Sequence, residues 1–240
     1  MRAFVSPCKL AERDNERHLA PMDAAEIEWR VSDKLVPYAE ALVFMQDRAT
    51  AIRAGEAREC VWLLEHPPLF TAGTSADPAE LINPLNLPVY EAGRGGRYTY
   101  HGPGQRVVYL MLDLEKRGRD IRCLVAALED WIIFALLELG VAAHRSAGRI
   151  GIWVGEGPDE AKIAALGIRV KRWVTLHGVS INVDPELAHF DGIVPCGISE
   201  FGVTSLAKIG KKTSLPRVDA VLKRGFPNFL RALHERHEVS

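Results

Sequence analysis

Apolar positions follow two different periods along the chain. Spacings of three and four residues predict α-helices, and Leu42, Met45, Ala49 and Ile52 mark one that Gly55 closes. Such helical patterns cover residues 37–54, 120–140 and 217–234. Short apolar runs bounded by glycine and proline predict β-strands at residues 61–64, 88–92, 97–100, 107–112, 150–154, 162–170 and 175–183. Two polar stretches rich in proline, residues 71–87 and 184–200, are predicted to be loops.

The order of these elements predicts one α+β domain with helices packed on a mixed β-sheet. There is no internal repeat and no linker that divides the chain. Residues 1–28 are polar and aperiodic, which is typical of a loosely attached extension. We therefore expect an N-terminal extension over residues 1–28 and a single folded domain over residues 29–240.

Composition and charge narrow the possible functions. The 240 residues are 48% hydrophobic, and 30 basic against 31 acidic side chains give a net charge of −1, which argues against a protein that coats nucleic acid. No run of eighteen apolar residues predicts a membrane span. The early acidic residues Glu12, Asp14 and Glu16 are untypical of a mitochondrial transit peptide. We expect a cytoplasmic protein that binds neither nucleic acid nor membrane.

The four cysteines are far apart and form no CxxC pair, so neither a disulfide framework nor a zinc finger is expected. Cys8, Cys60 and Cys123 are interpreted as packing residues, whereas Cys196 lies between Pro195 and Gly197, where inert packing is less natural.

Several common nucleotide and hydrolase motifs are absent. The sequence around Gly210 resembles the end of a P-loop, but Ser205 stands where the first glycine should be. A dinucleotide fingerprint starting at Gly93 fails because residue 98 is Tyr. There is no GxSxG or HExxH. These absences disfavour a P-loop ATPase, a Rossmann dehydrogenase, a serine hydrolase of the usual type and a zinc protease.

What remains is four glycine-bearing segments that also carry polar side chains. They read RGGRYTYHGPGQ at residues 94–105, KIAALGI at 162–168, LHGVSIN at 176–182 and IVPCGI at 193–198. Glycine permits close approach of the backbone to a ligand. In this order the segments resemble the lipoyl(octanoyl) transferase family over about residues 61–206, and the first of them is the most specific.

The resemblance implies an activity and a fold. Members of this family move an octanoyl group from acyl carrier protein to a lysine of a lipoyl domain, the first step of protein lipoylation. The implied acceptors are lipoyl domains of 2-oxoacid dehydrogenase complexes and the glycine cleavage H protein, and neither cofactor nor metal is implied. The implied fold is the catalytic fold of lipoate and biotin protein ligases, so residues 29–240 become the predicted octanoyltransferase catalytic domain.

The resemblance also assigns residues. It makes Cys196 the nucleophile that accepts the acyl group and Lys162 the group that lowers the pKa of its thiol. Both His101 and His177 can alternatively be structural hydrogen-bonding residues. The implied substrate-binding residues are Arg94, Gly95, Gly96, Arg97, Tyr98, Thr99, Tyr100, His101, Ala165, Leu166, Gly167, His177, Gly178, Val179 and Ser180.

Elementary chemistry agrees with a cysteine in this role. A thioester is already activated, so its transfer to an amine needs no ATP, and a thiolate divides the transfer into two easier steps. A free thiol is only a few per cent ionised at pH 7, and a nearby ammonium favours the thiolate. Three alternatives stay open: an ATP-dependent lipoate or biotin ligase, a cysteine hydrolase that uses Cys196 and His177, and a catalytically silent acyl-binding protein.

Overall fold

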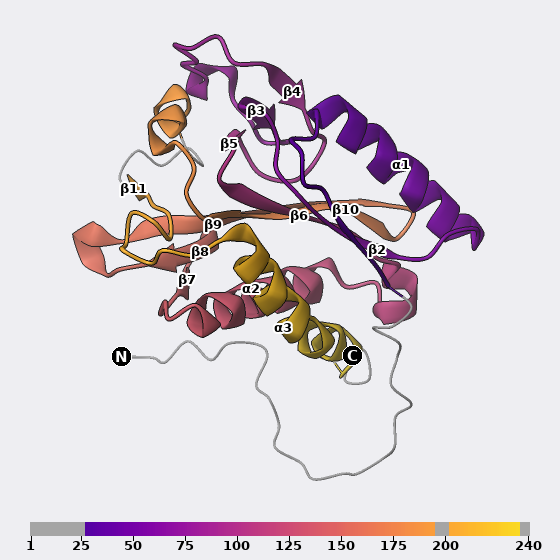
Figure 1. Cartoon of the computed structure of the whole chain (residues 1–240). Helices are drawn as coiled ribbons and strands as arrows, with labels where there is room; N and C mark the ends of the chain where they lie inside the picture. The colour runs from indigo at the N-terminus through magenta and orange to yellow at the C-terminus, as the bar shows by residue number, and fades with distance from the viewer. Residues whose placement is uncertain (1–26, 195–201, 236–240) are drawn as a thin grey trace.

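The computed structural model describes residues 27–194 and 202–235, which form a layered α+β fold (Figure 1). Its main layer is a mixed sheet with the strand order β1-β2-β6-β10-β9-β8-β7, and β11 pairs with β9. A smaller sheet has the order β4-β3-β5. The smaller sheet and α1 lie on one face of the main sheet, and α2 and α3 cover the other (Figure 1).

The predicted helices are confirmed with small shifts of their ends. They are α1 (Tyr38–Ala54), α2 (Ile121–Glu138) and α3 (Leu215–Glu235). Asp120 caps α2 because its side chain accepts hydrogen bonds from the backbone N–H groups of Arg122 and Cys123. Gly55 ends α1 with a left-handed φ of 76°, as its position in the sequence predicted.

The predicted strands correspond to β2 (Cys60–Leu64), β4 (Val89–Glu91), β5 (Thr99–His101), β6 (Gln105–Met111), β8 (Arg149–Val154), β9 (Ala161–Lys171) and β10 (Val174–Asn182). Four further strands were not predicted: β1 (Glu28–Val31), β3 (Leu69–Ala72), β7 (His144–Ser146) and β11 (Gly202–Val203).

Three sequence-based boundaries need correction. The supposed loop 71–87 begins inside β3 and contains a short 3₁₀ turn at Pro78–Glu80. The second supposed loop contains another at Leu187–Gly192. Ile27 is buried in the core and Glu28 pairs with Cys60, so these two residues belong to the fold and not to an extension.

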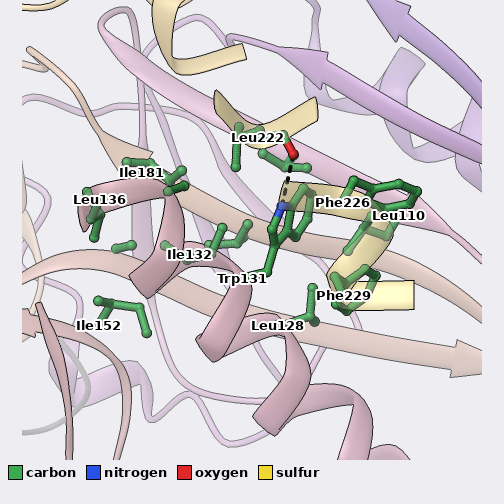
Figure 2. Packing of buried hydrophobic residues seen from close by; sticks show 14 of the residues in the cluster. Leu110, Leu128, Trp131, Ile132, Leu136, Ile152, Ile181, Leu222, Phe226 and Phe229 are labelled. Carbon is green, nitrogen blue, oxygen red and sulfur yellow. Dashed lines mark hydrogen bonds between the residues drawn. The ribbon is translucent and has the colours of Figure 1, made fainter. Parts of the chain in front are cut away.

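The largest core lies between the main sheet and helices α2 and α3. Alternate residues of each strand face it, such as Val61 and Leu63 of β2, because successive side chains of a strand point to opposite faces. Trp131 of α2 stacks on Phe229 of α3, and its Nε1 donates a hydrogen bond of 3.0 Å to the Leu222 carbonyl (Figure 2). This layer is mainly apolar and anchors the sheet, and it also buries the ion pair between Arg106 of β6 and Asp219 of α3, 2.9 Å apart.

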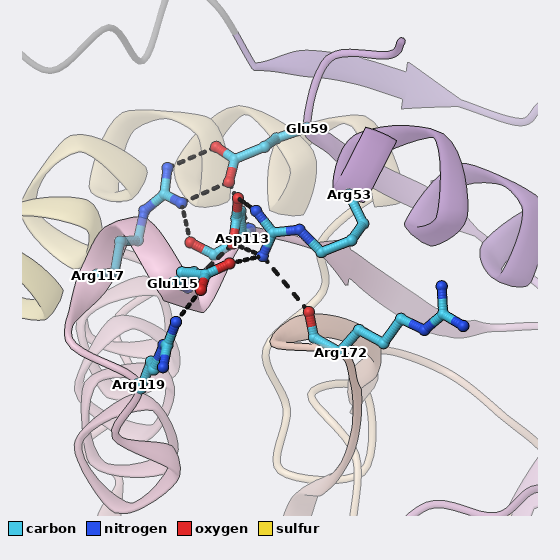
Figure 3. A network of polar contacts seen from close by, with 7 residues as sticks. All are labelled: Arg53, Glu59, Asp113, Glu115, Arg117, Arg119 and Arg172. Carbon is cyan, nitrogen blue, oxygen red and sulfur yellow. Dashed lines mark hydrogen bonds and ion pairs between the residues drawn. The ribbon is translucent and has the colours of Figure 1, made fainter. Parts of the chain in front are cut away.

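A polar network joins α1, the start of β2 and the turn that precedes α2 (Figure 3). Arg117 pairs with Glu59 through a hydrogen bond of 2.5 Å, and Arg53 pairs with Asp113, with Nη2 and Oδ2 2.9 Å apart. Buried ion pairs are tolerated only when both charges are hydrogen-bonded, as they are here. The network fixes the C-terminal end of α1 against the sheet.

Candidate active site

Most of the predicted site residues that the structure describes line one cavity of about 470 Å³. This volume is in the range typical of small-molecule sites. Lys162 lines it, and so do fourteen of the fifteen residues expected to bind substrate: Arg94, Gly95, Gly96, Arg97, Tyr98, Thr99, His101, Ala165, Leu166, Gly167, His177, Gly178, Val179 and Ser180. Three segments that are far apart in the sequence therefore meet at one place.

Tyr100 is the predicted substrate-binding residue that does not line the cavity. Its neighbours in β5, Thr99 and His101, face the cavity, so strand alternation turns Tyr100 the other way. Its ring packs on Phe70 and Phe190, and its hydroxyl lies 2.7 Å from His189 Nδ1. Tyr100 therefore supports the small sheet instead of facing a ligand.

Lys162 lies near the start of β9, between β8 and β11. Only 7% of the residue is exposed. Its ammonium lies 4.8 Å from the centroid of the Trp153 ring. The cavity therefore contains a buried cation whose position is set by two neighbouring strands.

Cys196, the predicted nucleophile, lies outside the described residues. The chain leaves the described part at Val194, whose N–H donates to the Glu80 carbonyl, and returns at Gly202. Gly202 and Val203 line the cavity and pair with Ala161 and Lys162. The first described residues after Cys196, Gly202 and Val203, are therefore adjacent to Lys162.

The two cysteines that the structure does describe are away from the cavity. Cys60 is fully buried, and burial raises the pKa of its thiol to about 11, which keeps it protonated and unreactive. Cys123 donates from Sγ to the carboxylate of Asp120, 3.3 Å away. Both agree with the structural interpretation.

Arg94 braces the glycine-rich wall. Its guanidinium donates to the carbonyl and hydroxyl of Thr71, 3.0 and 2.7 Å away, and to the carbonyls of Gly95 and Arg97. Its stem crosses Gly167, where a Cβ would lie 2.6 Å from Arg94 Cδ. Glycine at residue 167 is therefore required for the buried arginine to pass.

His101 is held by a chain of amides that fixes its tautomer. The Thr204 carbonyl can only accept, so it faces the amide NH₂ of Asn182, 2.9 Å away. Asn182 Oδ1 then accepts from the NH₂ of Gln105, and Gln105 Oε1 is left to face His101 Nδ1 at 2.6 Å. His101 therefore carries its proton on Nδ1. Burial holds the pKa of His101 well below its usual value, so the ring is neutral and Nε2 is the basic nitrogen.

Two further histidines lie beside it. His66 bridges the Val36 carbonyl at 2.6 Å and the Tyr109 hydroxyl at 2.7 Å, and burial lowers its pKa to about 4. His177 Nε2 lies 3.0 Å from the Tyr38 hydroxyl, and burial, with smaller contributions from Arg94 and Arg169, lowers its pKa to about 3. These rings are thus neutral hydrogen-bonding groups near pH 7.

His177 breaks the alternation of β10. Val179 and Ile181 pack on the α2–α3 face, and a regular strand would send His177 there too. Instead its φ is 64°, in the left-handed region, and its ring contacts Tyr38 and Tyr109 on the α1 face. Backbone strain of this kind is concentrated at functional sites.

The sequence-based reasoning missed the apolar part of the wall. It is formed by side chains of five elements, β6, α2, β8, β9 and β11, among them Val107, Ile121, Val125, Ile150, Trp153, Ile168 and Val203. Strand alternation could have pointed to Val107, but Ile121 and Val125 come from α2, which no local pattern brings to the site. An apolar wall beside a buried cation suits a ligand with a hydrocarbon tail and a polar head.

Comparisons with known proteins agree with this site. Residues 37–227 match the family model described as the lipoyl protein ligase A/B catalytic domain. An octanoyltransferase from Rhizorhabdus wittichii is 61% identical over 87% of this chain and 93% of its own length. One from Sphingopyxis alaskensis is 64% identical over 85% of this chain and 94% of its own length. This chain belongs to the octanoyltransferase family.

The fold of this octanoyltransferase family member is similar to solved ligase structures. A bipartite lipoate protein ligase from Thermoplasma acidophilum superposes with a TM-score of 0.64 over 85% of this chain and 84% of that one, at 17% identity. A lipoate-protein ligase A bound with ATP gives 0.63 over 85% and 86%, at 18% identity. These likenesses confirm the predicted fold class. The family assignment makes the protein an acyltransferase of lipoylation. In the described part, no helix is long and apolar enough to span a membrane.

Proposed function

We propose that this protein transfers an octanoyl group from octanoyl-acyl carrier protein to a specific lysine of lipoyl domains, through a thioester on Cys196. The observation that supports it most is the meeting of Lys162 and three glycine-bearing segments on one cavity with an apolar wall. Burial of each methylene of an acyl chain contributes about 0.8 kcal/mol to binding. The apolar wall therefore binds a long acyl chain more tightly than a two-carbon one.

The first step forms the enzyme thioester. The Cys196 thiolate attacks the thioester carbonyl of the donor, and the bond between that carbonyl and the carrier's sulfur breaks. The Lys162 ammonium favours the thiolate before attack and gives its proton to the departing carrier thiolate. Carrier protein leaves as a thiol, and Lys162 is left neutral.

The second step forms an amide. The amine of the acceptor lysine attacks the Cys196 thioester, and neutral Lys162 takes a proton from the attacking nitrogen. The carbon–sulfur bond breaks and returns the thiolate. No ATP is consumed because the energy of the thioester drives both steps.

The proposed donor and acceptors are octanoyl-acyl carrier protein, lipoyl domains of 2-oxoacid dehydrogenase complexes and the glycine cleavage H protein. Exposed Lys208, Lys211 and Lys212 offer a basic surface that suits an acidic carrier protein. The proposed setting is a reducing cytoplasm, where a nucleophilic thiol persists.

The test is an ATP-free transfer assay followed by intact mass measurement of the enzyme and the lipoyl domain. Octanoyl carrier protein should give an octanoyl adduct on the wild type, no adduct on Cys196→Ser, and an octanoylated lipoyl domain only with the wild type. Lys162→Met should slow transfer about 100-fold, within the usual range for loss of an acid–base group. Lys171→Met is the matched control, because Lys171 ends the same strand and is exposed.

Each alternative gives a different result. A ligase makes no octanoylated domain until ATP and free octanoate are added. A hydrolase releases free octanoate as fast as it consumes donor, and a silent binding protein gains no adduct. Any of these results contradicts the proposal.

A further inference from the structure

Lys162 has a long flexible stem, yet its ammonium has one defined place above an indole ring. Trp153 of β8 is directly opposite Lys162 in the antiparallel pair β8–β9. The register of this pair shifts between Ile152 and Trp153. Two residues of β8, Gly151 and Trp153, contact successive parts of the lysine side chain.

Gly151 leaves room for the stem. A Cβ at this residue would lie 3.0 Å from Lys162 Cε and 3.2 Å from Lys162 Cδ. These distances are shorter than ordinary van der Waals contact, so any larger residue would push the stem aside. The φ of Gly151 is 131°, which side chains also disfavour.

Trp153 receives the charged head. Trp153 is only 3% exposed. The Lys162 ammonium lies 4.8 Å from the centroid of its ring, within the range of a cation–π interaction. Such contacts are stronger when both groups are shielded from water, and Lys162 is only 7% exposed.

The indole ring is itself held in place. Its Nε1 donates to the Arg149 carbonyl at 3.4 Å, and the Arg149 guanidinium lies 4.2 Å from the ring centroid. Arg149 pairs with the carboxylate of Glu160 and donates to the Ser146 hydroxyl. The charge of Arg149 is therefore compensated by Glu160. The contacts with Arg149 hold the Trp153 ring in place independently of Lys162.

We propose that Gly151 and Trp153 are positioning residues that hold the Lys162 ammonium at the cavity, Gly151 by admitting its stem and Trp153 by binding its charge. This inference rests on the proposed function, in which Lys162 handles protons. A flexible ammonium is useful in both steps only if its position is restricted, because misplacement of about 1 Å can cost about 100-fold in rate.

The test compares variants of the full chain in the ATP-free assay. Trp153→Leu should lower kcat about tenfold with KM for the donor changed less than twofold, and Trp153→Phe, which keeps a smaller ring, should recover part of that loss. The pH at which iodoacetamide begins to alkylate Cys196 should rise in Trp153→Leu. Trp173→Leu is the matched control, because Trp173 also lies under an arginine, Arg119 at 5.4 Å, but does not line the cavity.

A second pair of variants isolates the stem contact. Gly151→Ala should lower kcat about tenfold. Gly157→Ala is its control, since Gly157 also has a left-handed φ, 57°, but a Cβ there meets nothing within 4 Å. Circular dichroism checks the helical and strand content of each variant. If Trp153→Leu is misfolded, the measurement on the conservative Trp153→Phe takes its place.

The outcomes separate this inference from the function on which it rests. If the wild type forms no adduct without ATP, the proposed function fails. If the wild type is active but Trp153→Leu and Gly151→Ala keep its kcat and its alkylation profile, the positioning role is wrong and the function stands. If Trp153→Phe is no better than Trp153→Leu, the ring holds the fold and not the charge, which also overturns the inference.

Discussion

The two faces of the main sheet are made by the same strands and differ in what they bury. The face under α2 and α3 buries mainly apolar side chains, including Trp131, Phe226 and Phe229, together with the ion pair Arg106–Asp219. The face under α1 also buries polar rings and amides, such as His66, His177 and Gln105. Buried polar groups cost free energy unless they are hydrogen-bonded. The hydrogen bonds on the α1 face therefore orient its side chains but add less stability than apolar packing would.

This difference predicts a division of labour. Substitutions in the part of the α2–α3 face that does not line the cavity should change the free energy of unfolding and leave transfer intact. Substitutions on the α1 face should change catalysis, histidine tautomers or the pH dependence of stability. The three predictions below test that division.

The largest expected effect is on the apolar face. Phe226 is 1% exposed, and its ring centroid lies 4.9 Å from Trp29 and 5.3 Å from Trp131. Phe226→Ala should lower the free energy of unfolding by about 3–5 kcal/mol, because it removes a buried ring and leaves a cavity. Urea denaturation measures this loss, and kcat of the folded fraction should not change.

Leu137→Ala is the control for that substitution. Leu137 is in α2, in the same layer, but is 62% exposed, so its loss should change stability by less than about 0.5 kcal/mol. A drop in kcat for Phe226→Ala at a temperature where it is fully folded would show that the two faces are coupled and would contradict the division.

Local patterns were sufficient for much of the fold. The three- and four-residue spacing located all three described helices, and apolar runs located the central strands β2, β6 and β10. Residues 69–72 form β3 although the sequence there continues into a polar stretch, because pairing with β4 and β5 stabilises it. Pairing of this kind depends on distant residues and has no local signal.

The candidate site shows the same limit. Glycine-bearing motifs pointed to residues that the fold brings together, since Arg94 and Gly167 do meet at the cavity. They could not show that alternation turns Tyr100 away, or that a left-handed φ turns His177 toward Tyr38. Nothing in the sequence singled out Trp153 within its apolar strand, because Trp153 contacts Lys162 only when β8 and β9 pair.

The second prediction concerns the amide chain on the α1 face. Gln105→Leu removes the acceptor for His101 Nδ1 and leaves Asn182 Oδ1 buried without its donor. The free energy of unfolding should fall by about 1–3 kcal/mol, the usual cost of an unpaired buried polar group. Nitrogen-15 NMR of the ring should show that His101 no longer has a single tautomer.

Gln105→Glu is the matched variant, because it keeps an oxygen facing His101 and loses only the NH₂ that donates to Asn182 Oδ1 and to the Tyr100 carbonyl. It should keep the proton of His101 on Nδ1 while losing similar stability. A single Nδ1–H tautomer in Gln105→Leu would show that something other than this chain orients His101.

The effect that is smallest near neutral pH is a slope in the pH dependence of stability. Burial lowers the pKa of His66 to about 4 in the folded state, and an unfolded histidine has a pKa near 6.5. Between these values the unfolded chain binds more protons, so the free energy of unfolding must fall as pH falls from about 6.5 to about 4. The contribution of His66 is at most about 1.4 kcal/mol per pH unit. Urea denaturation at several pH values should give a shallower slope for His66→Gln than for the wild type, and a constant difference between the two above pH 7. Equal slopes would mean that His66 binds its proton over the same pH range in the folded and unfolded protein. Below about pH 6.5 the α1 face would then bury a charge where the Val36 carbonyl and the Tyr109 hydroxyl now indicate a neutral ring.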